Sequence, residues 1–310
     1  MATANRSTSG QRTSLYYRYW EKGECQKKEL NVRKSFVRYG ITFLLTLMCV
    51  MVRAQTDPDE ISDTLERSKA RGKLLACADP YAFPSAAQNT DPPGYDVEIM
   101  RDIAKRGGMR LEMVWADTGT RGGTSRAFRN SILRKRCDVF VGMSDNGDDD
   151  MLMGQLAFTK PYIGMGYVLV VQGKAADKKS LAELKEANIK VGVSMSTPID
   201  DYLFSRNIPR SLYLDNRRIL QAMANGEIDA GMVWGTAISV ARQEYPQAKF
   251  HMVDGYVPEP DQRWNLNFIV RKQDQSLMKF IDDAVSDMLA NGKIKQVVES
   301  YGVPFYPPFP

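Results

Sequence analysis

The chain has 310 residues and a formal net charge of +5, with 43% hydrophobic and 25% charged residues. The positive charge is confined to the N-terminus: residues 1–54 hold ten Lys or Arg and three Glu, which leaves residues 55–310 slightly acidic. We therefore expect no basic face on the main part of the chain, and the composition excludes nucleic-acid binding.

Residues 1–54 have the three parts of a secretory signal peptide. A basic stretch ends at Arg38, an apolar core runs from Ile41 to Val52, and Val52-Arg53-Ala54 provides a cleavage site. The apolar core is shorter than the ~20 residues that a membrane-spanning helix needs. We expect cleavage after Ala54, export to the periplasm and no membrane span in the mature chain. A short uncleaved anchor is the alternative.

Two cysteines, Cys77 and Cys137, remain beyond the leader. An even number in an oxidising compartment favours a disulfide. Their places near the end of one predicted strand and at the start of another favour separation, so the sequence leaves the pairing open. The only histidine is His251, and no base is assured near either thiol. The sequence therefore predicts no enzyme and no cofactor.

Strands and helices alternate in the first half of the main chain. We expect a buried strand at 72–78, a helix at 95–105, a strand at 111–115, a helix around 127–133 and a third strand at 137–143. The third strand is an almost continuous apolar run, which is typical of a parallel strand covered on both faces. This β-α-β-α-β order predicts half of an open α/β sheet.

A second, similar unit follows. We expect strands at 167–171, 189–193 and 228–234 and helices at 181–186, 199–206, 217–225 and 236–245. After Trp264 the chain adds a strand at 266–270 and helices at 277–290 and 293–301. The proline-rich end, 304–310, is expected to pack as an extended tail.

Four motifs in this order resemble those of the type 2 periplasmic solute-binding proteins (solute-binding family 3). They are Gly94-Tyr95-Asp96-Val97-Glu98-Ile99, Cys137-Asp138-Val139, Phe158-Thr159-Lys160-Pro161-Tyr162 and Gly226-Glu227-Ile228-Asp229-Ala230. The resemblance covers most of residues 72–302. It implies a bilobal α/β fold, with two open α/β lobes joined by a two-segment hinge. Lobe 1 would comprise residues 72–162 plus 266–310, and lobe 2 residues 163–265.

The chain departs from the amino-acid receptors of that family at two places. Those receptors commonly hold the ligand carboxylate with an Arg shortly after the third strand, and its ammonium group with an Asp at the end of a lobe 2 strand. Here residues 144–150 read Ser-Asp-Asn-Gly-Asp-Asp-Asp, and the second position is Trp234. Both anchors of a zwitterion are missing, which argues against an amino-acid ligand.

Other segments resemble a narrower branch, the MoxJ/XoxJ-type accessory proteins of methanol oxidation. They are Cys77-Ala78-Asp79-Pro80, Arg136 to Val139, Thr159 to Tyr162 and Ile228 to Gly235. This resemblance implies a periplasmic partner of a PQQ-dependent quinoprotein methanol dehydrogenase. Residues 81–85 are closer to the XoxJ type, whose dehydrogenase uses a lanthanide. The alternative is the solute receptor of an ABC transporter for a ligand other than a standard amino acid. A periplasmic enzyme on the same fold would need a positioned acid or base and is the least favoured.

The resemblance also implies a cleft that binds a small molecule or a partner peptide. Its predicted lining is Asp79, Tyr81, Phe83, Ser144, Asp145, Tyr162, Thr197 and Trp234. The aromatic members could contact an apolar ligand or clamp a partner, with plain core packing as the alternative. The acidic loop 145–150 matches no EF-hand spacing and is expected to be a solvated turn without a metal. Ser196-Thr197-Pro198 is explained about equally well by helix capping and by anion binding.

Overall fold

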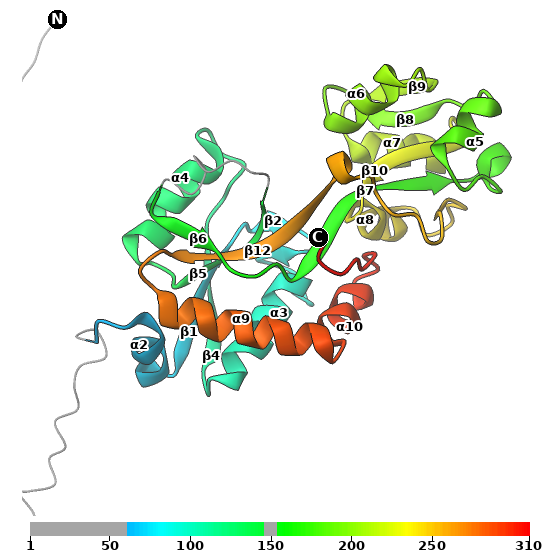
Figure 1. The fold of residues 1–310 in the computed structure, drawn as a ribbon. Coiled ribbons are helices and arrows are strands. Elements are labelled where there is room, and N and C mark those ends of the chain that lie inside the picture. Colours follow the sequence, from blue (N-terminus) through cyan, green and yellow to red (C-terminus); the bar gives the residue numbers. More distant parts are fainter. Residues whose placement is uncertain (1–60, 146–153) are drawn as a thin grey trace, which may run out of the picture. The chain divides into compact units, whose positions relative to one another are not determined.

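The structure is a computed structural model that describes residues 61–145 and 154–310. The predicted leader, 1–54, and most of the acidic loop, 146–150, lie outside the described residues. Within them, no helix is long and apolar enough to cross a bilayer. Ten strands form a sheet with the main order β4-β1-β5-β12-β7-β10-β8-β9 (Figure 1).

One half of this sheet begins with three parallel strands. Strand β1 (Lys73–Ala78) lies between β4 (Arg110–Trp115) and β5 (Val139–Asp145). The next strand, β12 (Arg263–Arg271), runs antiparallel to β5 and also pairs with the short β6 (Leu156–Phe158). A separate two-stranded ribbon, β2 (Tyr81–Ala82) and β3 (Ala86–Ala87), follows β1.

The other half of the sheet is built around β10 (Ala230–Trp234). This strand is antiparallel to β7 (Ile163–Val171) and parallel to β8 (Val191–Ser194). Strand β9 (Arg210–Tyr213) forms the edge beside β8, and β11 (His251–Met252) pairs with β7. The long strands β7 and β12 pair with each other and connect the two halves (Figure 1).

Four of the described α-helices, α2, α5, α6 and α7, start at a residue whose side chain caps the helix. Thr197 caps α6, and Pro198 occupies its first turn, where the missing amide proton costs nothing. Asp63 caps the first described helix, α2, by accepting a hydrogen bond from the Glu66 amide. The described α-helices are α2 (Thr64–Arg71), α3 (Tyr95–Arg106), α4 (Gly123–Asn130), α5 (Leu181–Glu186), α6 (Pro198–Ser205), α7 (Asn216–Ala224), α8 (Ala237–Glu244), α9 (Gln275–Ala290) and α10 (Lys293–Ser300).

The core consists of four apolar clusters, two for each half of the sheet. In the first half, alternate residues of β12 point to opposite faces, so Phe268 packs in the cluster of α3, α9 and α10 while Ile269 packs in that of α4. In the second half, one cluster includes residues of α5 and α6 and the other residues of α7 and α8. Because β7 contributes to clusters of both halves, the lobe boundaries at 162–163 and 265–266 stay a prediction.

Several elements differ from the prediction. Strand β7 begins at Ile163, four residues before the predicted start, and all nine of its residues are buried. Helix α4 ends at Asn130, where the Ser131 hydroxyl donates to the Ala127 carbonyl, and a 3-10 turn follows. Helix α2 and strand β9 were not predicted.

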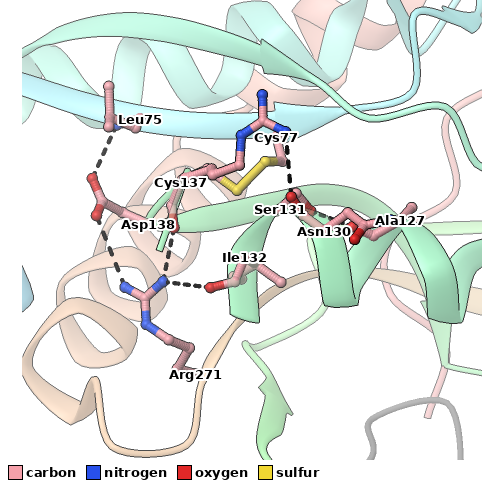
Figure 2. Close-up of a disulfide and its surroundings, with 10 residues drawn as sticks. Leu75, Cys77, Ala127, Asn130, Ser131, Ile132, Cys137, Asp138 and Arg271 are labelled. Carbon is pink, nitrogen blue, oxygen red and sulfur yellow. Dashed lines mark hydrogen bonds and ion pairs between the residues drawn. A yellow bond between two sulfur atoms is a disulfide. The ribbon is translucent and has the colours of Figure 1, made fainter. Parts of the chain in front are cut away.

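A disulfide joins Cys77 to Cys137, with the two Cα atoms 5.7 Å apart (Figure 2). The predicted strand at 137–143 would have held these residues apart. In the structure β5 starts only at Val139, opposite Ala76 of β1, so Cys137 precedes the ladder and is not held by its register. Both cysteines are fully buried, and the bond ties the entry of β5 to its neighbour β1.

A buried charge network surrounds this disulfide. Arg271 donates to the backbone carbonyls of Cys137 (2.8 Å) and Ile132 (3.0 Å), as Figure 2 shows. Its guanidinium also forms an ion pair of 2.7 Å with Asp274 and lies 3.9 Å from Asp138. These three charged side chains are almost completely buried. Asp138, the aspartate of the Cys137-Asp138-Val139 motif, therefore has a structural role.

Candidate functional site

Seven of the eight predicted cleft residues lie at or just beyond the carboxyl ends of four strands. Asp79, Tyr81 and Phe83 follow β1, and Ser144 and Asp145 end β5. Thr197 follows β8, and Trp234 ends β10. Ligands of open α/β sheets bind outside the carboxyl ends of the strands. These seven residues therefore lie where a ligand of such a sheet is expected, and both halves of the sheet contribute to them.

Trp234 belongs to a group of three aromatic side chains, which we call the aromatic cluster. Its ring centroid lies 5.6 Å from those of Tyr167 and Trp264, and the latter two are 6.2 Å apart. Tyr167 is paired with Trp234 across β7 and β10, and Trp264 is paired with Met165 across β12 and β7. Strand alternation therefore brings all three rings to the same face. The two tryptophans are only half-buried, so part of their surface is available to a ligand.

The backbone around Trp234 is fixed from both sides. Its amide donates to Oδ1 of Asn216 (3.3 Å), at the start of α7. The next amide, of Gly235, donates to the Gly166 carbonyl (3.0 Å) on β7. The indole packs against apolar clusters of both halves of the sheet. Trp234 is therefore held at the junction of the two halves.

The start of α6 adjoins the aromatic cluster and is capped by its own residues. Thr197 Oγ1 donates to the Ser194 carbonyl (2.7 Å) and accepts from the Asp200 amide, and the Tyr167 hydroxyl also hydrogen-bonds Thr197. The Asp200 carboxylate accepts from the Ser196 amide (3.0 Å) and pairs with Arg210 (2.6 Å). Because a carboxylate already occupies this helix start, the geometry favours capping over binding of a second anion.

Beyond β1, two of the three predicted residues have partners within the protein. Asp79 Oδ1 accepts from the Tyr81 amide (2.8 Å), and Oδ2 accepts from the amide and hydroxyl of Thr118, so Asp79 joins two loops. Phe83 packs against Tyr301 with ring centroids 6.4 Å apart. Tyr81, in contrast, is 79% exposed. It can therefore contact another molecule without any rearrangement of the core.

Tyr162 lies apart from the other predicted residues, in the core. Its side chain is fully buried, its ring stacks on Phe268 at 4.4 Å, and its hydroxyl donates to Asp96 Oδ1. Burial raises the pKa of Asp96 to about 7, and the hydrogen bond from Tyr162 partly opposes that shift. The second oxygen, Oδ2, faces Gly142, where φ is +75° and a Cβ would collide with the carboxylate. Tyr162 thus connects two of the four sequence motifs within one core.

Ser144 and Asp145 end β5 opposite Leu266 and Asn265 of β12. Ser144 is half-buried and Asp145 is exposed. The remainder of the acidic loop lies outside the described residues. Among residues 61–145 and 154–310, no group of three or more His, Cys, Asp or Glu side chains could hold a metal ion.

The sequence prediction missed Tyr167 and Trp264 as members of the site. Tyr167 is the first residue of a predicted strand, and Trp264 lies two residues before another. A signal was present in the alternation of the strands, since Tyr167 and Leu169 occupy one face of β7. That signal does not say which strand pairs with which, and therefore cannot bring the rings together.

Comparisons with known proteins agree with this architecture. Residues 73–304 match the family described as bacterial extracellular solute-binding proteins, family 3. The L-cystine-binding protein TcyJ of Escherichia coli (strain K12) is 24% identical over 270 residues, which cover 84% of this chain and 95% of that protein.

Among solved structures, the L-cystine solute receptor of Neisseria gonorrhoeae, in its unliganded open conformation, matches with a TM-score of 0.63 and 19% identity. That match covers 76% of this chain and 95% of the receptor. An ancestral cyclohexadienyl dehydratase matches with a TM-score of 0.59 and 18% identity, over 78% of this chain and 97% of that one. The fold therefore includes binding proteins and an enzyme.

These findings confirm the predicted fold class, whereas the narrower resemblance to MoxJ/XoxJ-type proteins stays a prediction. The family match spans most of the chain, from the first strand of the sheet to the proline-rich tail. On this evidence the chain belongs to the bacterial extracellular solute-binding proteins, family 3.

Proposed function

We propose that this protein is the solute receptor of a membrane transporter and that its ligand is not a standard amino acid. The observation that carries the proposal is the identity of the residue at the end of β10. Trp234 stands there, in contact with two other aromatic rings, where the amino-acid receptors that the chain resembles place an aspartate. An indole cannot neutralise a ligand ammonium group by ion pairing, so a different mode of recognition is required.

The chemistry of the region favours a neutral or cationic ligand with an apolar body. Aromatic faces bind apolar groups and attract cations through the ring quadrupole. The segment after β5 contains four aspartates and no arginine between residues 144 and 150. A ligand carboxylate would meet like charge there instead of the bidentate partner that an arginine provides. Cystine, which two of the three named relatives bind, carries two carboxylates and is therefore disfavoured.

The proposal includes secretion, with cleavage of the leader after Ala54, and no catalytic activity. Catalysis would need an acid or base directed at the ligand. The only histidine, His251, lies in β11 opposite Val171, four residues along β7 from Tyr167. Asp96, whose pKa is raised to about 7, is fully buried beneath Tyr162 and has no access to a ligand.

A second candidate is an accessory role toward a PQQ-dependent methanol dehydrogenase, here of the lanthanide-using type. The observation that favours it is the 79% exposure of Tyr81. A tyrosine in this position can anchor a protein interface, since Tyr and Trp supply much of the binding energy of interfaces. In this role the aromatic cluster would hold a segment of the partner.

A ligand screen with a matched pair of variants tests the main proposal. The purified protein is titrated with cystine, cationic amino acids, quaternary ammonium compounds and aromatic amines, while its melting temperature and tryptophan fluorescence are followed. A true ligand raises the melting temperature, and above its dissociation constant the shift keeps growing with the logarithm of the ligand concentration. Trp234→Ala should abolish that shift, and Trp115→Phe, which changes a tryptophan of β4 outside the aromatic cluster, should keep it.

Micromolar binding of cystine or another standard amino acid, retained in Trp234→Ala, would overturn the proposal. The accessory role has a separate readout, a pull-down from host periplasm. Capture of a methanol dehydrogenase by the wild-type protein, lost in Tyr81→Ala, together with a negative ligand screen would replace the first candidate with the second.

A further inference from the structure

The last residues of the chain make ordered contacts with both strands that connect the halves of the sheet. After α10, Tyr306 forms an antiparallel bridge to Gly164 of β7, with the Gly164 amide donating to the Tyr306 carbonyl at 2.9 Å. Three residues later, the Phe309 amide donates to the Asn265 side chain of β12 (2.8 Å), which in turn donates to the Phe309 carbonyl (3.0 Å). We call residues 303–309 the C-terminal strap.

The strap occupies a defined edge of β7. Strand β10 pairs with β7 only at residues 167–171, and β12 pairs with the opposite edge at residues 163–166. The bridge at Gly164 therefore uses the edge of β7 that β10 leaves open. The strap extends the sheet at the crossing between its halves (Figure 1).

Side-chain packing fits the strap to this place. The Phe309 ring lies so close to Gly164 that a Cβ there would be 2.6 Å from it. The Arg263 guanidinium stacks on the same Phe309 ring, 4.4 Å from its centroid. Gly164, Arg263 and Asn265 lie on the face of the β7–β12 pair opposite Trp264, because side chains alternate along a strand. The strap and the aromatic cluster thus cover opposite faces of the same two strands.

The strap also contacts core elements of each half. Val303 is buried in the cluster of α3, α9 and α10, whereas Tyr306 packs against the cluster of α7 and α8. The Tyr306 hydroxyl donates to the Tyr256 carbonyl at 2.7 Å. Pro304 lies against Gly235, the residue after Trp234, with a Cβ at Gly235 placed 3.4 Å from its ring. Any rotation between the halves must therefore stretch or carry this segment.

A small cavity lies at the base of the strap. It has a volume of about 210 Å³ and is lined by Ile238, Arg242 and Met252 on one side and by Glu299, Gly302, Val303 and Pro304 on the other. Its walls come from α8 and β11 on one side and from the end of α10 and the start of the strap on the other. The base of the strap therefore borders open space, whereas Tyr306 and Phe309 are held by hydrogen bonds to the hinge strands.

We propose that the C-terminal strap is a third connection across the hinge, which restricts the rotation of one half of the sheet relative to the other. Periplasmic binding proteins close around ligands by hinge motion. A segment that bonds to both hinge strands stabilises the conformation in which its contacts are made, and its contact with Gly235 couples that conformation to the position of Trp234. The distribution of conformations is set by the strap as well as by the ligand.

The test measures the distance between two spin labels in the purified protein. Labels at Asp177→Cys and Lys279→Cys, both exposed positions, report on the two halves, with Cys25 and Cys49 replaced by serine. Phe309→Ala and Asn265→Ala remove strap contacts, and Gly164→Ala pushes the Phe309 ring away. Each should widen the distance distribution about twofold. Deletion of Pro310 alone is the control and should leave it unchanged.

A double variant separates the strap contact from general damage. Gly164→Ala combined with Phe309→Ala should widen the distribution by less than the sum of the two single variants, because the methyl group then meets the Pro307 carbonyl but no ring. Distributions that superimpose on wild type, in variants with native circular dichroism, would overturn the proposal even if the melting temperature fell. Additive widening in the double variant would also contradict it.

Discussion

The buried carboxyl of Asp96 gives a quantitative prediction for the pH dependence of stability. Its pKa is about 7 in the folded protein against 3.8 for an ordinary aspartate, because burial disfavours the charged form. The folded state therefore keeps a proton that the unfolded chain releases above about pH 4. The stabilising contribution of this proton is fully present below pH 3.8 and is lost as the pH rises toward 7.

The size of the effect follows from the shift. A pKa difference of one corresponds to about 1.4 kcal/mol. The free energy of unfolding should therefore fall by roughly 4 kcal/mol through this group between about pH 4 and pH 7. Asp96→Asn removes the titration but keeps an oxygen that can accept from the Tyr162 hydroxyl. The variant should therefore gain stability relative to wild type as the pH rises, by that amount.

Urea unfolding at a series of pH values, for wild type and Asp96→Asn, measures this directly. Asp283→Asn, at an exposed position on α9, is the control and should track wild type. Tyr162→Phe removes the hydrogen bond that lowers the Asp96 pKa, so the loss of stability should extend to higher pH. A difference between wild type and Asp96→Asn that stays constant from about pH 4 to pH 8 would refute the reasoning.

Two further predictions concern the surroundings of the disulfide. Reduction of the bond between Cys77 and Cys137, which are 60 residues apart, should lower the free energy of unfolding by about 4 kcal/mol. The urea midpoint should fall when a reductant is present, and a Cys77→Ala/Cys137→Ala variant should not respond. Arg271→Met leaves Asp274 buried without its cation, whereas Asp138 keeps its 2.9 Å ion pair with Arg71, and the change should cost roughly 3–5 kcal/mol. A loss below about 1 kcal/mol in the same assay would show that the Arg271 guanidinium does not stabilise the buried carboxylates beside it.

The elements with strong local signals were predicted well. Helix α3 has apolar residues at helical spacing, and strands β1 and β5 are apolar runs bounded by turn residues. Strand β9 was missed because Arg210-Ser211-Leu212-Tyr213 is neither apolar nor strictly alternating. It forms a strand because β8 offers it a parallel partner over four residues.

The start of β7 shows a second limit of prediction from local sequence patterns. Gly164 and Gly166 weaken the strand pattern locally, yet both are needed because other backbone and side-chain atoms approach them closely. Phe309 lies against Gly164, and the Gln262 carbonyl lies against Gly166. Phe309 is 145 positions from Gly164 and Gln262 is 96 positions from Gly166, so no local pattern reveals these approaches.

In the candidate site, too, the residues placed by local motifs were predicted, whereas the contacts between distant residues were not. Thr197 and Trp234 were placed at strand ends because the motifs around them fix those ends. The prediction for Tyr162 could not show that its ring stacks on Phe268, 106 residues further along the chain. Tyr167 and Trp264 enter the aromatic cluster only through antiparallel pairing of β7 with β10 and β12.

The position of β12 constrains the order in which the protein can fold. This strand lies between β5 and β7, yet it comes from residues 263–271, more than a hundred residues after β5. During synthesis, which starts at the N-terminus, β1, β4 and β5 are made first. The edge of β5 that later pairs with β12 then stays unpaired until β12 is made. The segment from β8 to β10 has its neighbours close in sequence and can assemble earlier. The half of the sheet that begins the sequence is therefore the last to be completed.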